Sequence, residues 1–223
     1  MTTEATPGLR GVIVADTAIG DVRGDEGFFH YREHDALFLA RTCSFEEVWY
    51  LMVDGTLPTT AQLATFGDSA LAGRHIPASL GPLVNALSPT LSGLSSAIGA
   101  FADAVAMRPM LDLSEQERRP DALVLCAVAP TILCAMHRGS LGLAPIAPRD
   151  DLGFAANYLW MLTGLEPTAE ITRAIETYLV LTVDHGFNAS TFTARVIAST
   201  GASVAAALAG ACGALSGPLH GGA

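Results

Sequence analysis

The sequence predicts an all-α fold that begins with a short β-hairpin. Apolar residues recur at helical spacing from Ser44 onward, and prolines divide the following chain into segments of helical length. Two extended runs around a Gly/Asp-rich segment near the N-terminus predict the hairpin. Half of the 223 residues are hydrophobic and only 15% are charged, so the chain can bury a sizeable core and is not disordered. We assign residues 1–43 to the hairpin and a connecting segment, and residues 44–223 to one helical domain.

The hairpin is predicted between residues 8 and 32. Val12–Val14 is a β-prone run, and Phe28–Arg32 provides the second one. The polar segment Gly20–Gly27 lies between them and predicts the turn. We expect this hairpin to be the only sheet.

The first helix of the domain is predicted to begin after Ser44. Ser44 and Glu47 have the spacing of a capping box, in which each side chain bonds the other residue's backbone N–H, and Gly55 provides a stop. Pro130 should kink a later helix or mark its true start. The last helix consists almost wholly of small residues, which favours a deep core or an intimate subunit contact. The further predicted helices lie near 60–72, 78–87, 90–106, 121–137, 151–163, 168–183, 190–200 and 202–215.

Charge and cysteine usage exclude several classes of protein. The formal net charge is -10 and all 12 basic residues are Arg, so no basic stripe is available for nucleic acid. No apolar stretch reaches the roughly 20 residues that a membrane span needs, and the N-terminus has no signal-peptide pattern. The 4 cysteines are far apart in the sequence. They predict reduced thiols in a cytoplasmic protein, rather than a disulfide scaffold or a zinc ribbon.

Familiar catalytic motifs are absent or out of context. The pentapeptide His30–His34 matches the HxxEH pattern of zinc peptidases, which needs both imidazoles on one face of a helix. Here it follows Phe28–Phe29 in a predicted strand and turn, so we expect no metal site. The absence of Lys excludes a P-loop, and no serine lies in a GxSxG context.

The most informative residues lie in the last forty positions. Asp184–Thr191 separates two predicted helices, and Asn188 or Ser190 can cap the second one. An imidazole from His185, a carboxamide and hydroxyls next to exposed N–H groups could bind a small carboxylate, although an ordinary polar loop would use the same residue types. His220 lies in a second, Gly-rich segment, where an imidazole is suited to proton transfer near neutral pH.

Two long motifs resemble the signature region of the citrate synthase family: DHGFNASTFTARVIAST and GALSGPLHGGA. The resemblance extends to the N-terminal half through GLRGVIVADTAIGDV, YREHDALFLA and SFEEVWYLMVDGTLPT, and so covers essentially the whole chain. It implies the multi-helical large domain of that family with its opening hairpin. It also implies an acyltransferase that condenses acetyl-CoA with oxaloacetate to citrate and CoA, by enolisation, carbon–carbon bond formation and thioester hydrolysis.

The resemblance assigns roles to four residues and requires no metal or cofactor. His220 corresponds to the catalytic histidine that hydrogen-bonds the thioester carbonyl as the enol forms. His185 corresponds to the histidine that binds oxaloacetate, and Asn188 lines the same pocket. Ser190 corresponds to the serine that orients the catalytic histidine. We expect the imidazoles of His185 and His220 to share one cavity.

Family members have a further segment, a smaller domain and closing helices, which contributes a second catalytic histidine, a catalytic aspartate and most Arg ligands. The 223-residue chain is therefore expected to be inactive alone, with His220 exposed to solvent and poorly ordered. A 2-methylcitrate synthase that uses propionyl-CoA stays open as an alternative, because one methylene changes binding by only about 1–3 kcal/mol. The other alternative is a non-catalytic helical dimerisation module, since family members are homodimers; residues 78–106 and 202–215 are the predicted interface.

Overall fold

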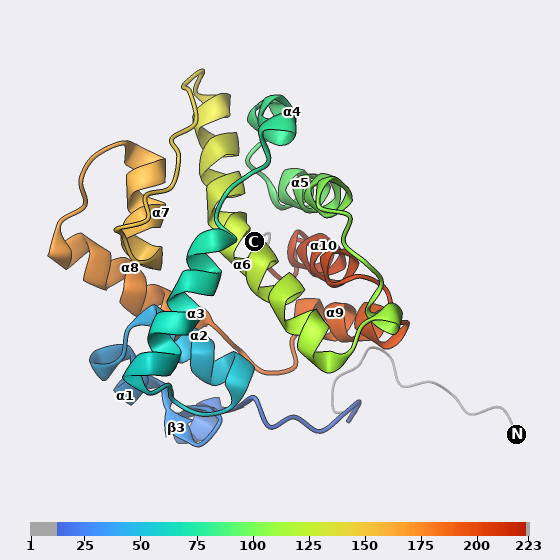
Figure 1. Ribbon diagram of the computed structural model, residues 1–223. Helices are drawn as coiled ribbons and strands as arrows, with labels where there is room; N and C mark the ends of the chain where they lie inside the picture. Colours follow the sequence, from blue (N-terminus) through green and yellow to red (C-terminus); the bar gives the residue numbers. More distant parts are fainter. Residues whose placement is uncertain (1–12, 222–223) are drawn as a thin grey trace, which may run out of the picture.

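The computed structural model describes residues 13–221, and this part is predominantly helical, as predicted (Figure 1). Its strands are β1 Gly20–Arg23, β2 Phe28–Tyr31 and β3 His34–Asp35, and its short 3-10 helices are η1 Gly24–Glu26, η2 Ala78–Leu80 and η3 Met110–Asp112. Its α-helices are α1 Ala36–Thr42, α2 Phe45–Asp54, α3 Thr60–Ala72, α4 Gly81–Ala86, α5 Leu91–Ala104, α6 Glu115–Ser140, α7 Phe154–Thr163, α8 Ala169–Thr182, α9 Ala189–Ser199 and α10 Val204–Leu215.

The N-terminal hairpin is present, but its first strand was predicted in the wrong place. β1 pairs antiparallel with β2, with Gly20 opposite Tyr31, and it occupies part of the predicted turn. The real turn is η1, which ends at Gly27 with a positive φ of 64° that glycine tolerates without strain. Ile13 and Val14 are not in a strand, and Val12 lies outside the described residues. β3 adds a short third strand.

The strands also separate the two histidines of the HxxEH pattern. His30 lies in β2 and His34 in β3, so they do not share a helical face. Across residues 13–221, no group of three or more His, Cys, Asp or Glu side chains is gathered closely enough to hold a metal ion.

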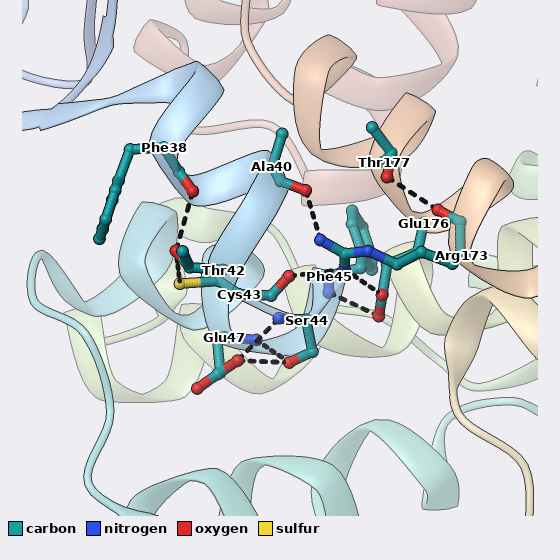
Figure 2. A network of polar contacts seen from close by, with 10 residues as sticks. All are labelled: Phe38, Ala40, Thr42, Cys43, Ser44, Phe45, Glu47, Arg173, Glu176 and Thr177. Atoms are coloured by element: carbon teal, nitrogen blue, oxygen red, sulfur yellow. Dashed lines mark hydrogen bonds and ion pairs between the residues drawn. The ribbon is translucent and has the colours of Figure 1, made fainter.

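The prediction missed α1, which lies inside the segment assigned as a connection. Asp35 caps its first turn by accepting from the N–H of Phe38 at 2.7 Å. The capping box at the start of α2 is confirmed: Ser44 accepts from the N–H of Glu47, and Glu47 accepts from the N–H of Ser44 at 2.7 Å. Figure 2 shows how α8 contacts the junction between these two helices. The division of the chain at residue 43 stays a prediction.

The long helix α6 forms the centre of the fold and lies between two hydrophobic clusters. Leu123 and Ala127 belong to the cluster with α1, α2, α3 and α8, whereas Leu125 and Val128 belong to the cluster with α4, α5 and α10. Figure 1 shows α6 between these two groups of helices. Apolar residues all around a helix are expected when it is buried on several sides.

The predicted start of α6 at residue 121 was wrong. The helix begins six residues earlier, because Ser114 and Glu117 form a second capping box with a 2.8 Å bond from the N–H of Ser114. It continues through Pro120 and Pro130, which remove one backbone donor each without ending it. By length and composition α6 could span a membrane; half of its most apolar window is buried in the protein, as in a core helix.

The remaining helices agree with the predictions, with end shifts of a few residues. One exception is the predicted 78–87 helix, which is divided into η2 and α4. The last two helices, α9 and α10, form an antiparallel pair, joined by a tight turn in which Gly201 has a φ of 77°. Gly210 allows a close approach, since a Cβ there would lie 2.2 Å from Cδ1 of Ile197 on α9. This pairing brings the start of α9 next to the end of α10.

Candidate active site

The start of α9 and the segment after α10 bring together three of the four predicted site residues. Asn188 is the N-cap of α9: its Oδ1 accepts from the N–H of Thr191 at 2.9 Å. The hydroxyl of Ser190 donates to the same Oδ1 at 2.8 Å. Nε2 of His220 lies 3.0 Å from Oγ of Ser190. A continuous hydrogen-bonded chain therefore links His220 to Ser190 and Asn188, as expected if Ser190 orients the histidine.

His220 is held by the backbone as well as by this contact. Its N–H donates to the carbonyl of Gly217 at 3.0 Å, and the N–H of Gly221 donates to the carbonyl of Leu215 at 3.1 Å. A Cβ at Gly221 would lie 2.4 Å from Cδ1 of Leu215, so this turn packs tightly against the end of α10. The expectation of a solvent-exposed His220 is wrong, because the side chain is half-buried and hydrogen-bonded. The expected poor order of this residue stays a prediction.

His185 lies in the loop before α9 and is oriented by different neighbours. Its ring meets Phe29 of β2 edge to face, with ring centroids 6.3 Å apart. The preceding Asp184 closes a turn by accepting from the N–H of Gly186 at 3.0 Å. Within residues 13–221, His185 makes no hydrogen bond to Asn188, Ser190 or His220. The shared cavity of the two imidazoles stays a prediction.

The N-terminal hairpin packs against the loop that carries His185. Tyr31 of β2 is fully buried next to it, and burial raises the pKa of its phenol to about 12. Gly20 of β1 packs so closely that a Cβ there would lie 2.4 Å from Oδ2 of Asp184. The small sheet is therefore a platform for the His185 loop.

Arg195 on α9 is a residue near the site that the sequence analysis did not identify. Its guanidinium lies over the ring of Phe187, 4.9 Å from the centroid, and thereby links α9 to the His185 loop. It also lines an open cavity of about 680 Å³ between α2, α6, α9 and α10, together with Arg118 and Arg119. Arg195 lies inside the motif DHGFNASTFTARVIAST, which begins at Asp184. Its residue type alone does not predict that the side chain contacts Phe187 or lines this cavity.

The buried thiols are poor nucleophiles, because burial raises their pKa. Burial raises the pKa of Cys134 to about 12, and it also raises the pKa of Cys212 on α10. Thiols of this kind stay protonated near neutral pH. The chemistry available at the site is therefore that of the imidazoles, the hydroxyl, the carboxamide and the helix N-terminus of α9, where backbone N–H groups favour anions.

Comparison with known proteins identifies relatives along the whole chain. A family model described as "Citrate synthase, C-terminal domain" matches residues 8–223. The chain is 40% identical over 216 residues to a 2-methylcitrate synthase of Mycobacterium tuberculosis (strain ATCC 25618 / H37Rv) and 40% identical over 221 residues to a citrate synthase of Mycolicibacterium smegmatis. Both alignments cover 97% of this chain, but only 55% and 58% of the two relatives.

Two solved structures share this fold. The citrate synthase of Pyrobaculum aerophilum superimposes with a TM-score of 0.86 and 34% identity, over 95% of this chain and 55% of that protein. A ternary complex of carboxymethyl coenzyme A and oxaloacetate with the citrate synthase of Thermoplasma acidophilum gives a TM-score of 0.92 and 25% identity, over 99% and 58%. The chain thus spans a little more than half the length of these relatives. The match over residues 8–223, together with these similarities, shows that the chain belongs to the citrate synthase family.

Proposed function

We propose that this chain carries one part of the active site of a citrate synthase, an acyltransferase that condenses acetyl-CoA with oxaloacetate to give citrate and CoA. The observation that carries the proposal is the hydrogen-bonded chain from Asn188 through Ser190 to His220. It lies inside the matched family region, and the relative from Thermoplasma acidophilum was solved with oxaloacetate and a coenzyme A derivative.

The proposed role of His220 follows from the chemistry of enolisation. The methyl protons of a thioester are very weakly acidic, so their removal requires stabilisation of the negative charge that develops on the carbonyl oxygen. A positioned imidazole N–H supplies a hydrogen bond to that oxygen. The enol carbon then attacks the ketone carbon of oxaloacetate, and hydrolysis of the resulting thioester releases CoA as a thiol.

The proposed roles of His185 and Asn188 concern the second substrate. Oxaloacetate carries two carboxylates and a ketone, which need hydrogen-bond donors. The imidazole of His185 and the carboxamide N–H₂ of Asn188 are such donors, and the N-terminus of α9 contributes a favourable field for an anion. We place the base that removes the methyl proton, the second catalytic histidine and the Arg ligands in the part of the family enzymes that this chain does not match.

A 2-methylcitrate synthase is the second candidate, because a relative with that name is 40% identical to this chain, the same value as for a citrate synthase. The two activities differ in the acyl-CoA, acetyl against propionyl. The residues that contact the additional methyl group of propionyl-CoA are proposed to lie outside the matched region.

The test is CoA release, measured with a thiol reagent, from the native protein that carries this sequence, with oxaloacetate and either acyl-CoA. We expect turnover with acetyl-CoA, and a loss of about 10³-fold in kcat/KM for His220→Gln. His75→Gln is the matched control, since His75 is exposed and far from α9 in the sequence. Faster turnover with propionyl-CoA would select the second candidate, and no CoA release with either thioester would refute both.

We also propose that the chain forms homodimers in the cytoplasm. All four cysteines are free thiols, which is usual in a reducing compartment. The helices α9 and α10 are rich in small and apolar residues, and no residue of α9 is buried. Dimerisation is a role that does not require the catalytic groups proposed for the unmatched part of the family enzymes.

A further inference from the structure

We infer that Phe29 of β2 is a positioning residue for His185, which holds the imidazole by an aromatic contact and leaves both ring nitrogens free for oxaloacetate. The inference deepens the proposed function and rests on it for its catalytic meaning. The ring of Phe29 meets that of His185 edge to face, with an interplanar angle of 83° and with the ring centroids 6.3 Å apart. This geometry lies within the range that aromatic pairs prefer.

The ring nitrogens of His185 are not used by the protein itself. The side chain is exposed, and within residues 13–221 its nitrogens make no hydrogen bond and no ion pair. Phe29 provides the only aromatic contact of this imidazole in the same range. A ring that bonded a protein acceptor through one nitrogen would have one nitrogen fewer for a ligand. An aromatic contact restrains the ring and occupies neither nitrogen.

Phe29 is suited to this role because it is itself held in place. Its ring packs edge to face on Tyr31, with the ring centroids 5.0 Å apart and an interplanar angle of 78°. Tyr31 is fully buried in a hydrophobic cluster against which Phe29 and Val183 both pack, and Val183 lies two positions before His185. The series of rings from Tyr31 through Phe29 thus connects the exposed imidazole to the core.

Phe28, the preceding residue of β2, has different neighbours. Successive residues of a strand point to opposite faces, so Phe28 lies on the face away from Phe29. Its ring stacks on that of His30, with the centroids 3.9 Å apart, and the guanidinium of Arg23 lies 3.8 Å from its centroid. Phe28 therefore offers a matched control in the same strand.

The functional consequence concerns the binding of oxaloacetate. Without the Phe29 ring, the imidazole of His185 has more orientations in the free protein, and a ligand must restrict them to one. This entropy is lost when oxaloacetate binds, before enolisation begins. The effect should therefore appear in the KM for oxaloacetate rather than in kcat. The acyl-CoA, whose carbonyl is proposed to contact His220, should bind as before.

The test is steady-state kinetics of the native protein that carries this sequence. In Phe29→Leu we expect the KM for oxaloacetate to rise about threefold to tenfold, the worth of one aromatic pair. The kcat and the KM for the acyl-CoA should change by less than about twofold. Phe29→Tyr keeps an aromatic ring at this position and should restore the low KM for oxaloacetate. Phe28→Leu removes a ring of the same size and should leave this KM unchanged.

A second measurement uses no substrate. The ring current of Phe29 displaces the ¹H NMR signals of the His185 imidazole, which are assigned by their loss in His185→Gln. We expect these signals to move in Phe29→Leu and to keep their positions in Phe28→Leu. If the wild-type protein released no CoA, the proposed function would fail, and these signals would still decide whether Phe29 positions the ring.

Three results would overturn the inference. The first is an unchanged KM for oxaloacetate in Phe29→Leu, and the second is an equal rise of this KM in Phe29→Leu and Phe28→Leu. The third is a set of His185 ring signals that does not respond to Phe29→Leu.

Discussion

The guanidinium of Arg173 on α8 donates to the carbonyl oxygen of Cys43 at 3.0 Å, where α1 ends and α2 is about to begin (Figure 2). It also donates to the carbonyl of Ala40 and pairs with Glu176, one turn further along α8, at 2.5 Å. Glu176 in turn accepts from the N–H of Phe45 at 3.1 Å. One pair on α8 thus satisfies the C-terminal end of α1 and the N-terminal end of α2.

Arg173→Met should lower the free energy of unfolding by about 1–3 kcal/mol, because two carbonyls lose their side-chain donor and the half-buried carboxylate of Glu176 loses its ion-pair partner, while most of the apolar stem is kept. Arg108→Met is the matched control. Its ion pair with Glu117 is about half exposed on both sides, so the expected change is within about 0.5 kcal/mol. Urea unfolding of both variants measures the difference, and equal losses would contradict the assignment.

Gly20→Ala should disturb the loop that carries His185, because the added methyl group would meet Oδ2 of Asp184 at 2.4 Å. The carboxylate must then move, and its bond from the N–H of Gly186 is lost. We expect faster hydrogen exchange of the Gly186 amide, by about tenfold for a bond worth roughly 1.4 kcal/mol. Gly24→Ala is the control, since a Cβ at Gly24 meets no atom within 4 Å. Unchanged exchange in Gly20→Ala would show that the hairpin does not support the loop.

The protein should lose stability as the pH rises from about 9 to 12. Burial raises the pKa of both Tyr31 and Cys134 to about 12, from ordinary values of 10.0 and 9.0. Between these limits the unfolded chain releases protons that the folded chain keeps, so unfolding becomes more favourable, by a few kcal/mol at most. Below about pH 9 these groups are protonated in both states and contribute no slope. Urea unfolding over this range should show the decline, and Tyr31→Phe should reduce it above pH 10.

The sequence predicted the helices best where the helix ends are encoded locally. The Ser44–Glu47 box gave α2 its correct start, and the predicted 60–72 helix has the bounds of α3. α1 was missed because it is only seven residues long and depends on Arg173, more than a hundred positions away, for the carbonyls at its end. The first hairpin strand was misplaced because β1 is chosen by its pairing with β2, and not by the β-prone run before it.

The sequence predicted which residues form the candidate site, but it did not predict the distances and hydrogen bonds between them. Two motifs named Asn188, Ser190 and His220, and the helix pair α9–α10 brings them together. The hydrogen-bond direction along this chain depends on distances that no sequence pattern contains. The same holds for Arg195, whose contact with Phe187 follows from the way the loop before α9 folds back on that helix.

The proposed homodimer predicts a sedimentation mass of twice the 23.1 kDa chain at micromolar concentration. α9 carries apolar residues although none of its residues is buried, and its Val196 is 48% exposed. A charge at the centre of an apolar interface is costly to desolvate, so Val196→Glu should weaken association at least tenfold. Leu165→Glu, in the loop between α7 and α8 and also exposed, should leave association unchanged. A monomer at all concentrations would refute the dimer, and equal effects of both variants would place the interface elsewhere.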